Sequence, residues 1–385
     1  MEHQTRILFT RALKGFPDSR LEKEVYSLSK KYSVSVFGWD RENKYKKVSK
    51  SENKVFGKKI IFYHVGIPAP NGEGFSKLLL PLLKFWSVEY KFLINKKDSF
   101  DIIHACDFDT ALIAFLAAKR LNKKIVYDIF DYYAESHKAP RIIKYLIKKI
   151  DTFVISKSDA TIICSELRRK QIGMAKPNNL IVIHNTPIEN KSLQEGTEDL
   201  NYCNRKIRLV YVGLLSDDRF LENISNVICS RKDIEWHIGG WGKLDNYFKK
   251  LSEQYKNIIY YGMMPYTDVL KLEKKCDLMT AIYDPNLPNH TYAAPNKFYE
   301  ALMIKKPLIM VQGTGMDSYI TEYNLGEVIN LNGHSFEESF SQAITNLIGI
   351  RGYWKQMGEN GYMLYKSEFS WDEMERRLLS LYSLI

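Results

Sequence analysis

Short apolar runs alternate with amphipathic segments along the whole chain, and this alternation predicts the class of fold. Apolar residues spaced three and four apart predict helices, for example over 19–31 and 110–121. Strands that alternate with helices form parallel sheets covered on both faces, so we expect an α/β protein. The predicted strands are 6–10, 34–38, 59–64, 101–105, 125–129, 160–164 and 180–184 in the first half, and 207–213, 234–239, 257–262, 277–282, 307–311 and 327–330 in the second.

The alternation is interrupted at residues 190–206, a polar stretch without apolar periodicity. At 385 residues the chain is long enough for two domains. We therefore predict two open α/β domains of similar size that face each other across a cleft. Ligands of such sheets bind beyond the carboxyl ends of the strands, so a site is expected in the loops that follow strands.

Several of these loops contain glycine. Gly15 follows the first strand, and Gly213 follows the first strand of the second half. Glycines at 239–242 and at Gly262 follow the next two strands. Tight strand-to-helix turns need glycine for steric reasons, so each loop alone says little. None has the spacing GxGxxG or GxxxxGK[ST], which argues against a nicotinamide dehydrogenase or a P-loop ATPase.

The segment 295–309 carries most of the candidate chemistry. Pro295 suits the first turn of a helix, and Pro307 is expected to end that helix before a buried strand. Backbone N–H groups, the positive end of the helix dipole and the Lys297 ammonium would together hold a phosphate. Glu300, one turn further on, would accept hydrogen bonds from the hydroxyls of an attached ribose. The same residues also fit a surface helix with both side chains solvated, and the pattern leaves the two interpretations open.

Positive charge is concentrated in the first half. Residues 1–190 hold 34 of the 56 Lys and Arg and 20 of the 45 Asp and Glu, a net charge of +14, against −3 for 191–385. Two stretches, 77–97 and 137–157, mix lysines with aliphatic and aromatic residues, as helices lying on anionic lipid do. They fit equally well helices that cover a sheet with solvated lysines outward. No aromatic–basic motif accompanies the charge, so nucleic acid is not expected as a partner.

The expected location is the cytoplasm, at most at the inner face of the cytoplasmic membrane. No signal peptide is apparent, and the most apolar stretch, 78–88, is too short for a membrane span. The cysteines are odd in number and lack CxxC spacing, which predicts free thiols in a reducing compartment. They are Cys106, Cys164, Cys203, Cys229 and Cys276.

A series of short motifs runs through nearly the whole chain. In the first half these are Asp18-Ser-Arg20, Phe100-Asp-Ile-Ile-His104, Lys124-Ile-Val-Tyr-Asp128, Asp159-Ala-Thr-Ile-Ile-Cys-Ser165 and Val182-Ile-His-Asn185. In the second half they are Leu209-Val-Tyr-Val-Gly213, the glycines of 239–242, Tyr260-Tyr-Gly262, Pro295-Asn-Lys297 with Glu300, and Phe369-Ser-Trp-Asp372. In order and spacing this series resembles the retaining glycosyltransferases of family 4, which have the two-domain GT-B fold.

The resemblance implies a domain plan and an activity. Residues 1–190 would bind the acceptor, 191–206 would be a linker, 207–365 would bind the nucleotide sugar, and 366–385 would form a helix that packs back on the first domain. The enzyme would move a sugar, as a hexosyltransferase does, from a UDP- or GDP-sugar with retention at the anomeric carbon, without a metal or another cofactor. The acceptor would be a glycan or lipid-linked glycan in bacterial capsule, exopolysaccharide or lipopolysaccharide synthesis.

The resemblance also implies roles for individual residues. Glu300 would bind the nucleotide ribose, Asn296 and Lys297 would hold the diphosphate, and Arg219 would be its second counter-charge. Gly15 would let the first domain approach the donor. Trp241 and Met263 would flank the base or its ribose. Gly213, Gly240 and the backbone at Ala294 are the other positions on the donor side.

Two positions depart from the family pattern. The family often has a glutamate where this chain has Tyr292, and a histidine where it has Phe130. Asp131 is then the candidate for the polar group closest to the reacting sugar, although it would also suit the N-cap of the next helix. Asp107 and Asp109 have the Asp-x-Asp form of metal-dependent glycosyltransferases of another fold, but we expect them to cap the helix from Thr110.

These departures keep two other functions open. One is a nucleotide-sugar 2-epimerase or hydrolase of the same fold, which would consume the donor without an acceptor. The other is a sugar-nucleotide-binding subunit that has lost catalysis.

Overall fold

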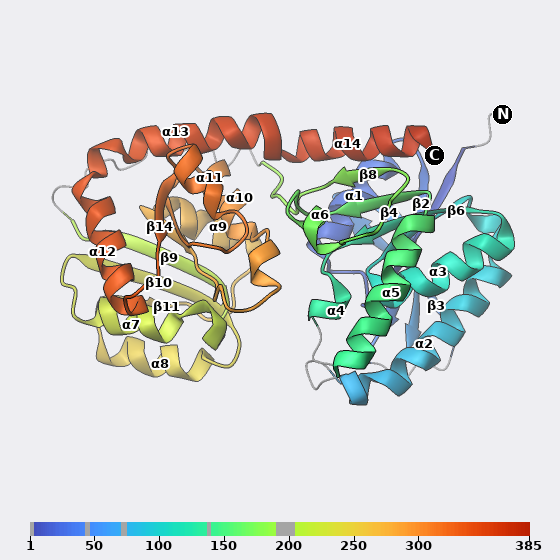
Figure 1. Ribbon diagram of the computed structural model, residues 1–385, viewed down its shortest axis with the longest axis horizontal. Coiled ribbons are helices and arrows are strands. Elements are labelled where there is room, and N and C mark those ends of the chain that lie inside the picture. The colour runs from blue at the N-terminus through green and yellow to red at the C-terminus, as the bar shows by residue number, and fades with distance from the viewer. Residues whose placement is uncertain (1–3, 43–46, 71–74, 137–139, 190–204) are drawn as a thin grey trace. The chain divides into compact units, whose positions relative to one another are not determined.

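The computed structural model describes residues 4–42, 47–70, 75–136, 140–189 and 205–385 (Figure 1). The chain forms two compact units. Unit 1 comprises residues 1–185 and 374–385, and unit 2 comprises 186–373. The predicted linker, 191–206, lies almost wholly outside the described residues. Of the predicted free cysteines, Cys106, Cys164, Cys229 and Cys276 are free, and Cys203 is outside the described residues.

Unit 1 is built on one eight-stranded sheet in the order β3-β4-β2-β1-β5-β6-β7-β8. Its strands are β1 (Arg6–Arg11), β2 (Ser33–Asp40), β3 (Ser49–Val55), β4 (Lys58–Gly66), β5 (Ile102–Cys106), β6 (Lys124–Ile129), β7 (Ala160–Ile163) and β8 (Leu180–Val182). Its helices are α1 (Ser19–Ser29), α2 (Phe75–Asn95), η1 (Lys97–Ser99), α3 (Phe108–Leu121), α4 (Tyr133–Ser136), α5 (Arg141–Lys157), α6 (Arg168–Gln171) and most of α14 (Trp371–Leu384).

All seven strands predicted in the first half are present, and they pair in parallel. The eighth, β3, was not predicted. It pairs antiparallel with β4 through a two-residue turn at Phe56 and Gly57, both with positive φ. Its sequence, SKSENKV, is almost entirely polar because it is an edge strand with little apolar surface to bury. Apolar periodicity therefore gave no signal for it.

Unit 2 is built on a six-stranded parallel sheet in the order β11-β10-β9-β12-β13-β14. Its strands are β9 (Ile207–Leu214), β10 (Ile234–Trp241), β11 (Ile258–Tyr260), β12 (Leu278–Ala281), β13 (Leu308–Val311) and β14 (Gly326–Ile329). Its helices are η3 (Asp217–Arg219), α7 (Leu221–Cys229), α8 (Asp245–Gln254), α9 (Tyr266–Lys275), η4 (His290–Tyr292), α10 (Asn296–Met303), α11 (Asp317–Glu322), α12 (Phe336–Gly349), η5 (Arg351–Tyr353), α13 (Trp354–Leu364) and the π-helical turn η6 (Tyr365–Phe369). One apolar core lies on each face of this sheet.

The predicted helix and strand of 295–309 are present as α10 and β13, but both proline assignments are wrong in detail. Pro295 is the N-cap residue, with extended φ and ψ of −67° and 134°, rather than part of the first turn. The helix ends at Met303, before Pro307. Lys305, at a φ of 61°, turns the chain, and Pro307 comes just before β13.

Side-chain contacts anchor α14 on unit 1. Glu375 accepts hydrogen bonds from Ser27 and Lys30 of α1. The hydroxyl of Tyr382 lies 2.6 Å from Nδ1 of His104, a fully buried residue of β5. Helix α5 is anchored from its inner face, where Val154 and Ile155 are buried and the carboxylate of Asp151 accepts a hydrogen bond of 2.8 Å from the hydroxyl of Tyr127.

The buried Asp151 makes a prediction for stability against pH. Burial raises the pKa of this carboxyl to about 7, above its value of about 3.9 in an unfolded chain. The folded state therefore holds a proton that the unfolded state has lost, and the free energy of unfolding should fall as pH rises from about 4 to about 7. In Asp151→Asn, the free energy of unfolding measured with urea should no longer fall between about pH 4 and pH 7 for this reason. The variant should be more stable than the natural protein above pH 7.

The matched control is Asp268→Asn on α9, whose carboxylate is half exposed. It should leave the pH profile unchanged. An Asp151→Asn profile that runs parallel to the natural one over this range would contradict the prediction.

Candidate functional site

The sheet of unit 2 has its topological switch point between β9 and β12. From β9 the chain proceeds outward to β10 and β11, and from β12 it proceeds the other way to β13 and β14. At such a point the loops that follow two neighbouring strands diverge and leave room for a ligand. The loop after β9 leads to η3, and the loop after β12 leads through η4 to α10.

Lys297, in the first turn of α10, reaches back over the end of β9. Its ammonium lies 4.8 Å from the ring centroid of Tyr211. A Cβ atom placed on Gly213 would lie 2.6 Å from the same nitrogen. The absence of a side chain at Gly213 therefore makes the space that this ammonium occupies. Asn296 is exposed in the same helical turn, and the N-cap residue Pro295 has no side chain that caps it.

Arg219 is held in place from three sides. Its guanidinium forms an ion pair of 2.9 Å with Asp218 and lies 3.7 Å from the ring centroid of Tyr283. Its Nη1 also lies 3.0 Å from Nε2 of His290, whose Nδ1 is 2.9 Å from the carbonyl oxygen of Asp284. Because that carbonyl can only accept, Nδ1 carries a proton. Nε2 also lies 3.3 Å from the carboxylate of Asp218. The arginine is thus oriented before any ligand binds.

The two cations share one environment. Burial raises the pKa of the Tyr211 hydroxyl, and Arg219 is among the nearby charges that oppose this rise. The ring of the same Tyr211 lies under Lys297. The hydrogen bond from His290, together with Ser216 and Arg219, holds the pKa of Asp218 well below its usual range. Two positive groups and one fixed negative group therefore surround the end of β9, an arrangement suited to an anion.

Glycines allow close backbone contact at the carboxyl ends of β9 and β10. Gly240, at a φ of +133°, lies so close to Gly213 that a Cβ atom there would be 1.7 Å from the Gly213 carbonyl oxygen. The Gly240 amide donates to the carbonyl of Gly262 over 2.7 Å. The carboxyl ends of β9 and β10 and the turn after β11 are thus in direct backbone contact. Trp241 and Met263 project from these segments, with 56% and 76% of their surface exposed.

Glu300 lies one turn further into α10 and is buried. The hydroxyl of Tyr266 donates to its Oε1 over 2.9 Å. Glu273 of α9 lies in the same environment, fully buried, and among the described residues neither of its carboxylate oxygens has a hydrogen-bond partner. Burial, and then the charge of Glu300, raises the pKa of Glu273, while Lys297 lowers it. Glu300 thus belongs to the same group of interacting charges as Lys297.

The backbone near Ala294 packs against the loop that follows β13. A Cβ atom on Gly315 would lie 1.9 Å from the carbonyl oxygen of Ala293, and Ala294 is partly buried against the core. Tyr292 ends the short helix η4.

The two candidate residues of unit 1 lie in the loops that follow β1 and β6. Gly15 has a φ of +76°, and a Cβ atom there would lie 3.2 Å from Val36. Asp131 is 61% exposed and pairs with the buried Arg168 over 2.9 Å. Phe130, beside it, lies under two guanidinium groups, those of Arg11 and Arg20, at 4.3 and 4.5 Å from its ring centroid.

The expected capping by Asp107 and Asp109 is wrong. Asp107 precedes α3, but its side chain makes no capping hydrogen bond. It pairs instead with Arg11 and accepts from the backbone amide of Phe130 over 2.9 Å. It therefore ties the end of β5 to the loop after β6. Burial and the charge of Asp107 raise the pKa of Asp109 to about 7.

Sequence reasoning missed a buried charge network beneath these loops. Arg20 of α1 pairs with Asp128 over 2.6 Å and with Glu24 over 3.1 Å. His104 lies 3.3 Å from Asp128 and 3.5 Å from Glu24. The side chains of Glu24, His104 and Asp128 could offer ligand atoms to a metal. Arg20, however, already supplies a positive charge to both carboxylates. No periodicity signals contacts between residues so far apart in sequence.

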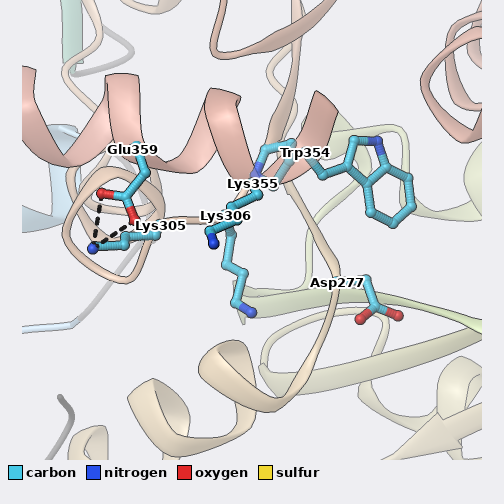
Figure 2. A pocket seen from close by; sticks show the side chains of 7 residues that line it. Asp277, Lys305, Lys306, Trp354, Lys355 and Glu359 are labelled. Carbon is cyan, nitrogen blue, oxygen red and sulfur yellow. Dashed lines mark hydrogen bonds and ion pairs between the residues drawn. The ribbon is translucent and has the colours of Figure 1, made fainter. Parts of the chain in front are cut away.

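A separate hollow lies at the opposite, amino-terminal end of β13 (Figure 2). Its volume of about 10 Å³ is room for a single water molecule. Lys305 and Glu359, which line it, pair over 2.9 Å. The hollow therefore offers no place for a substrate, and the candidate site remains at the carboxyl end of β9.

The contact between Gly240 and Gly213 predicts the effect of a single methyl group. Gly240→Ala should lower the free energy of unfolding by at least about 3 kcal/mol, because it combines a left-handed backbone with a direct clash. Gly262→Ala is the matched control, since Gly262 also has a positive φ of +66° but has open space around its Cβ position. It should cost only about 1 kcal/mol. Equal losses of stability in urea unfolding would refute the tight contact.

No protein-family model and no curated protein sequence matches this chain. Solved structures do match it over its full length. Sucrose-phosphate synthase from Thermosynechococcus elongatus has a TM-score of 0.72 at 12% identity, over 99% of this chain and 99% of that one. HepE from Anabaena in complex with UDP has a TM-score of 0.69 at 13% identity, over 99% and 100%. WaaG, a glycosyltransferase involved in lipopolysaccharide biosynthesis, has a TM-score of 0.65 at 13% identity, over 97% and 99%.

At these identities the similarity concerns the fold. The matched proteins are glycosyltransferases with the GT-B fold, and two parallel-sheet, Rossmann-like units make up this chain as well. The predicted fold class is therefore confirmed: this chain has the GT-B fold.

Proposed function

We propose that this protein is a retaining glycosyltransferase that uses a nucleotide diphosphate sugar as its donor. The observation that carries the proposal is the convergence of Lys297 and Arg219 around Tyr211, at the switch point of the unit 2 sheet. Two cations beside a helix N-terminus fit a pyrophosphate better than a single carboxylate. HepE, which shares the fold, has been solved with UDP and with UDP-glucose, and this supports a donor of the same class.

The proposed chemistry is stabilisation of a leaving group. When the bond between the anomeric carbon and the diphosphate breaks, negative charge grows on the phosphate oxygens. Lys297, the amide groups at the start of α10 around Asn296, and Arg219 would stabilise this charge without a metal. Groups that are oriented beforehand need not reorganise during the reaction, and the contacts of Arg219 with Asp218 and His290 supply that orientation.

The nucleoside would be recognised next to the diphosphate. The carboxylate of Glu300, oriented by Tyr266, would accept hydrogen bonds from the ribose hydroxyls. Trp241 and Met263 would provide apolar surface for the base or ribose, and Gly213 and Gly240 would let the nucleotide lie close to the backbone. The backbone at Ala294 would meet the sugar. We propose either a UDP- or a GDP-sugar as the donor.

The acceptor side is proposed for unit 1. Asp131 would be the polar group closest to the reacting sugar, and Gly15 would allow the backbone to approach the donor. A growing glycan, free or attached to a lipid, is the proposed acceptor, in the synthesis of a bacterial surface polysaccharide in the cytoplasm. The excess of basic residues in the first half and the fold shared with WaaG, whose role is in lipopolysaccharide biosynthesis, support this proposal.

Two observations favour testing other functions in parallel. Tyr292 and Phe130 replace groups that the family often uses, so an inactive donor-binding subunit is a second candidate. A hydrolase or 2-epimerase would release nucleotide or a changed sugar from the donor alone. Incubation of the donor with and without a glycan acceptor, followed by chromatography of nucleotide and sugar products, separates the three functions.

The diphosphate site predicts a loss of affinity on removal of one cation. In isothermal titration of UDP and GDP, the preferred nucleotide should bind Lys297→Ala about tenfold to a hundredfold more weakly than the natural protein, because a charge-assisted hydrogen bond is lost. Lys271→Ala on α9 is the control, since Lys271 is exposed and pairs with Asp268. Equal affinities in the two variants would exclude Lys297 from the diphosphate site.

The ribose contact predicts an interaction between one side chain and one hydroxyl. The natural protein should bind UDP more tightly than 2′-deoxy-UDP, or GDP more tightly than 2′-deoxy-GDP. In Glu300→Gln this preference should shrink by about 1 kcal/mol or more, because the charged acceptor is replaced by a neutral one. If the preference for the ribonucleotide were as large in Glu300→Gln as in the natural protein, Glu300 would not contact the ribose.

A further inference from the structure

The outer face of α5 exposes a continuous apolar stripe. Its five members are Ile142, Tyr145, Leu146, Ile150 and Phe153, and Ile142 alone exposes 75% of its surface. Their spacing places them on one side of the helix. The opposite side is packed into unit 1 through Val154, Ile155 and the Asp151–Tyr127 hydrogen bond. The stripe is therefore the outer face of a helix whose inner face is packed against the rest of unit 1.

Neighbouring helices extend the stripe. Helix α3 packs against α5 on one side and α2 on the other (Figure 1). It contributes the exposed Leu116, and Phe115 of α3 meets Phe153 edge to face at 5.7 Å. The first turns of α2 contribute Leu79, Leu80 and Leu83. We call the exposed apolar residues of α2, α3 and α5 the three-helix patch.

The three-helix patch is surrounded by positive charge. Exposed basic residues on the three helices are Lys77, Lys84, Lys91, Lys119, Arg120, Arg141, Lys149 and Lys157. Lys144 and Lys148 are half-buried, and Lys148 pairs with Glu135 of α4 over 2.8 Å. The ammonium of Lys149 lies 4.7 Å from the ring of Tyr145, inside the stripe itself. The carboxylates on these helices are Glu89, Asp109 and Asp151, which are buried or mostly buried. Apolar and positive groups therefore face outward together, and no described carboxylate of these three helices is exposed among them.

We propose that the three-helix patch binds the surface of an anionic lipid bilayer. Apolar side chains would enter the boundary between headgroups and acyl chains, while the lysines would extend to the phosphates. Each basic residue near an anionic surface adds to the attraction, and the attraction is screened by salt. No helix among the described residues is long and apolar enough to cross a bilayer, so this contact would be peripheral.

The charge distinguishes lipid from a second copy of the chain. Two copies that met through this patch about a two-fold axis would bring the same lysines against each other, which is unfavourable. An anionic bilayer offers the complementary charge together with an apolar layer. The proposal rests on the surface of unit 1 alone and does not depend on the proposed catalytic function.

The test is flotation of the full chain with lipid vesicles. The natural protein should float with vesicles of phosphatidylcholine and phosphatidylglycerol, should float much less with phosphatidylcholine alone, and should be released by salt. Ile142→Ser/Leu146→Ser/Ile150→Ser should reduce partitioning into the anionic vesicles roughly tenfold or more, because three apolar side chains no longer enter the membrane. Lys144→Glu/Lys149→Glu should also bind more weakly and lose most of the salt dependence.

The matched control removes three exposed apolar side chains from unit 2, in Ile350→Ser/Tyr353→Ser/Met363→Ser. It should bind vesicles as the natural protein does. These positions are exposed or partly exposed, so we expect every variant to fold. Thermal unfolding checks this. Unchanged flotation of the α5 serine variant, or an equal loss in the control, would overturn the proposal. So would a change from dimer to monomer in sedimentation without a change in flotation, because the patch would then join two copies.

Discussion

Close backbone contact between the carboxyl ends of β9 and β10 is the constraint on which the candidate site depends. Gly240 adopts a left-handed φ of +133° directly against the carbonyl of Gly213. Because Gly213 has no side chain, the Lys297 ammonium can occupy the space beside it. A side chain at either glycine would move a strand end or displace the lysine. The position of the ammonium is therefore set by the absence of side chains on β9 and β10, and only then by α10.

Among the described residues, the two cations at this position have different partners. Asp218 pairs with Arg219, while Lys297 lies against the face of Tyr211, where a ring attracts a cation far less strongly than a carboxylate does. Glu273, the carboxyl whose pKa Lys297 lowers, is nevertheless pushed toward its neutral form by burial and by Glu300. The remaining positive charge is a reason for an anion to bind here. The rings of Tyr211 and Tyr283 lie 4.8 and 3.7 Å from the two cations and attract them without neutralising them.

Apolar patterning predicted the strands well because a parallel sheet buries its strands on both faces, so each strand is an apolar run. Apolar patterning did not predict β3, because its residues are polar and it lies at an edge of the sheet. Lys297 and Glu300 were predictable as candidates because they are close in sequence and on one helix. The contacts of Arg219 with His290 and Tyr283 were not, because they join residues 71 and 64 positions apart, and nothing local marks such a pair. The same reason hid the pairing of Arg20 with Asp128, and it misled the capping assignment for Asp107, whose carboxylate is used by Arg11 and by the Phe130 amide.

The network in unit 1 also explains why an aromatic ring fits at position 130. Arg11 and Arg20 both lie over its ring, and both are committed to carboxylates, Arg11 to Asp18 and Asp107 and Arg20 to Glu24 and Asp128. A neutral aromatic ring attracts two guanidinium groups, whereas a protonated histidine would repel them. Arg11 and Arg20 are thus matched by carboxylates that are themselves buried or mostly buried. The excess of positive charge in the first half must therefore lie mainly on lysines at the surface, and several of these flank the exposed apolar face of α5.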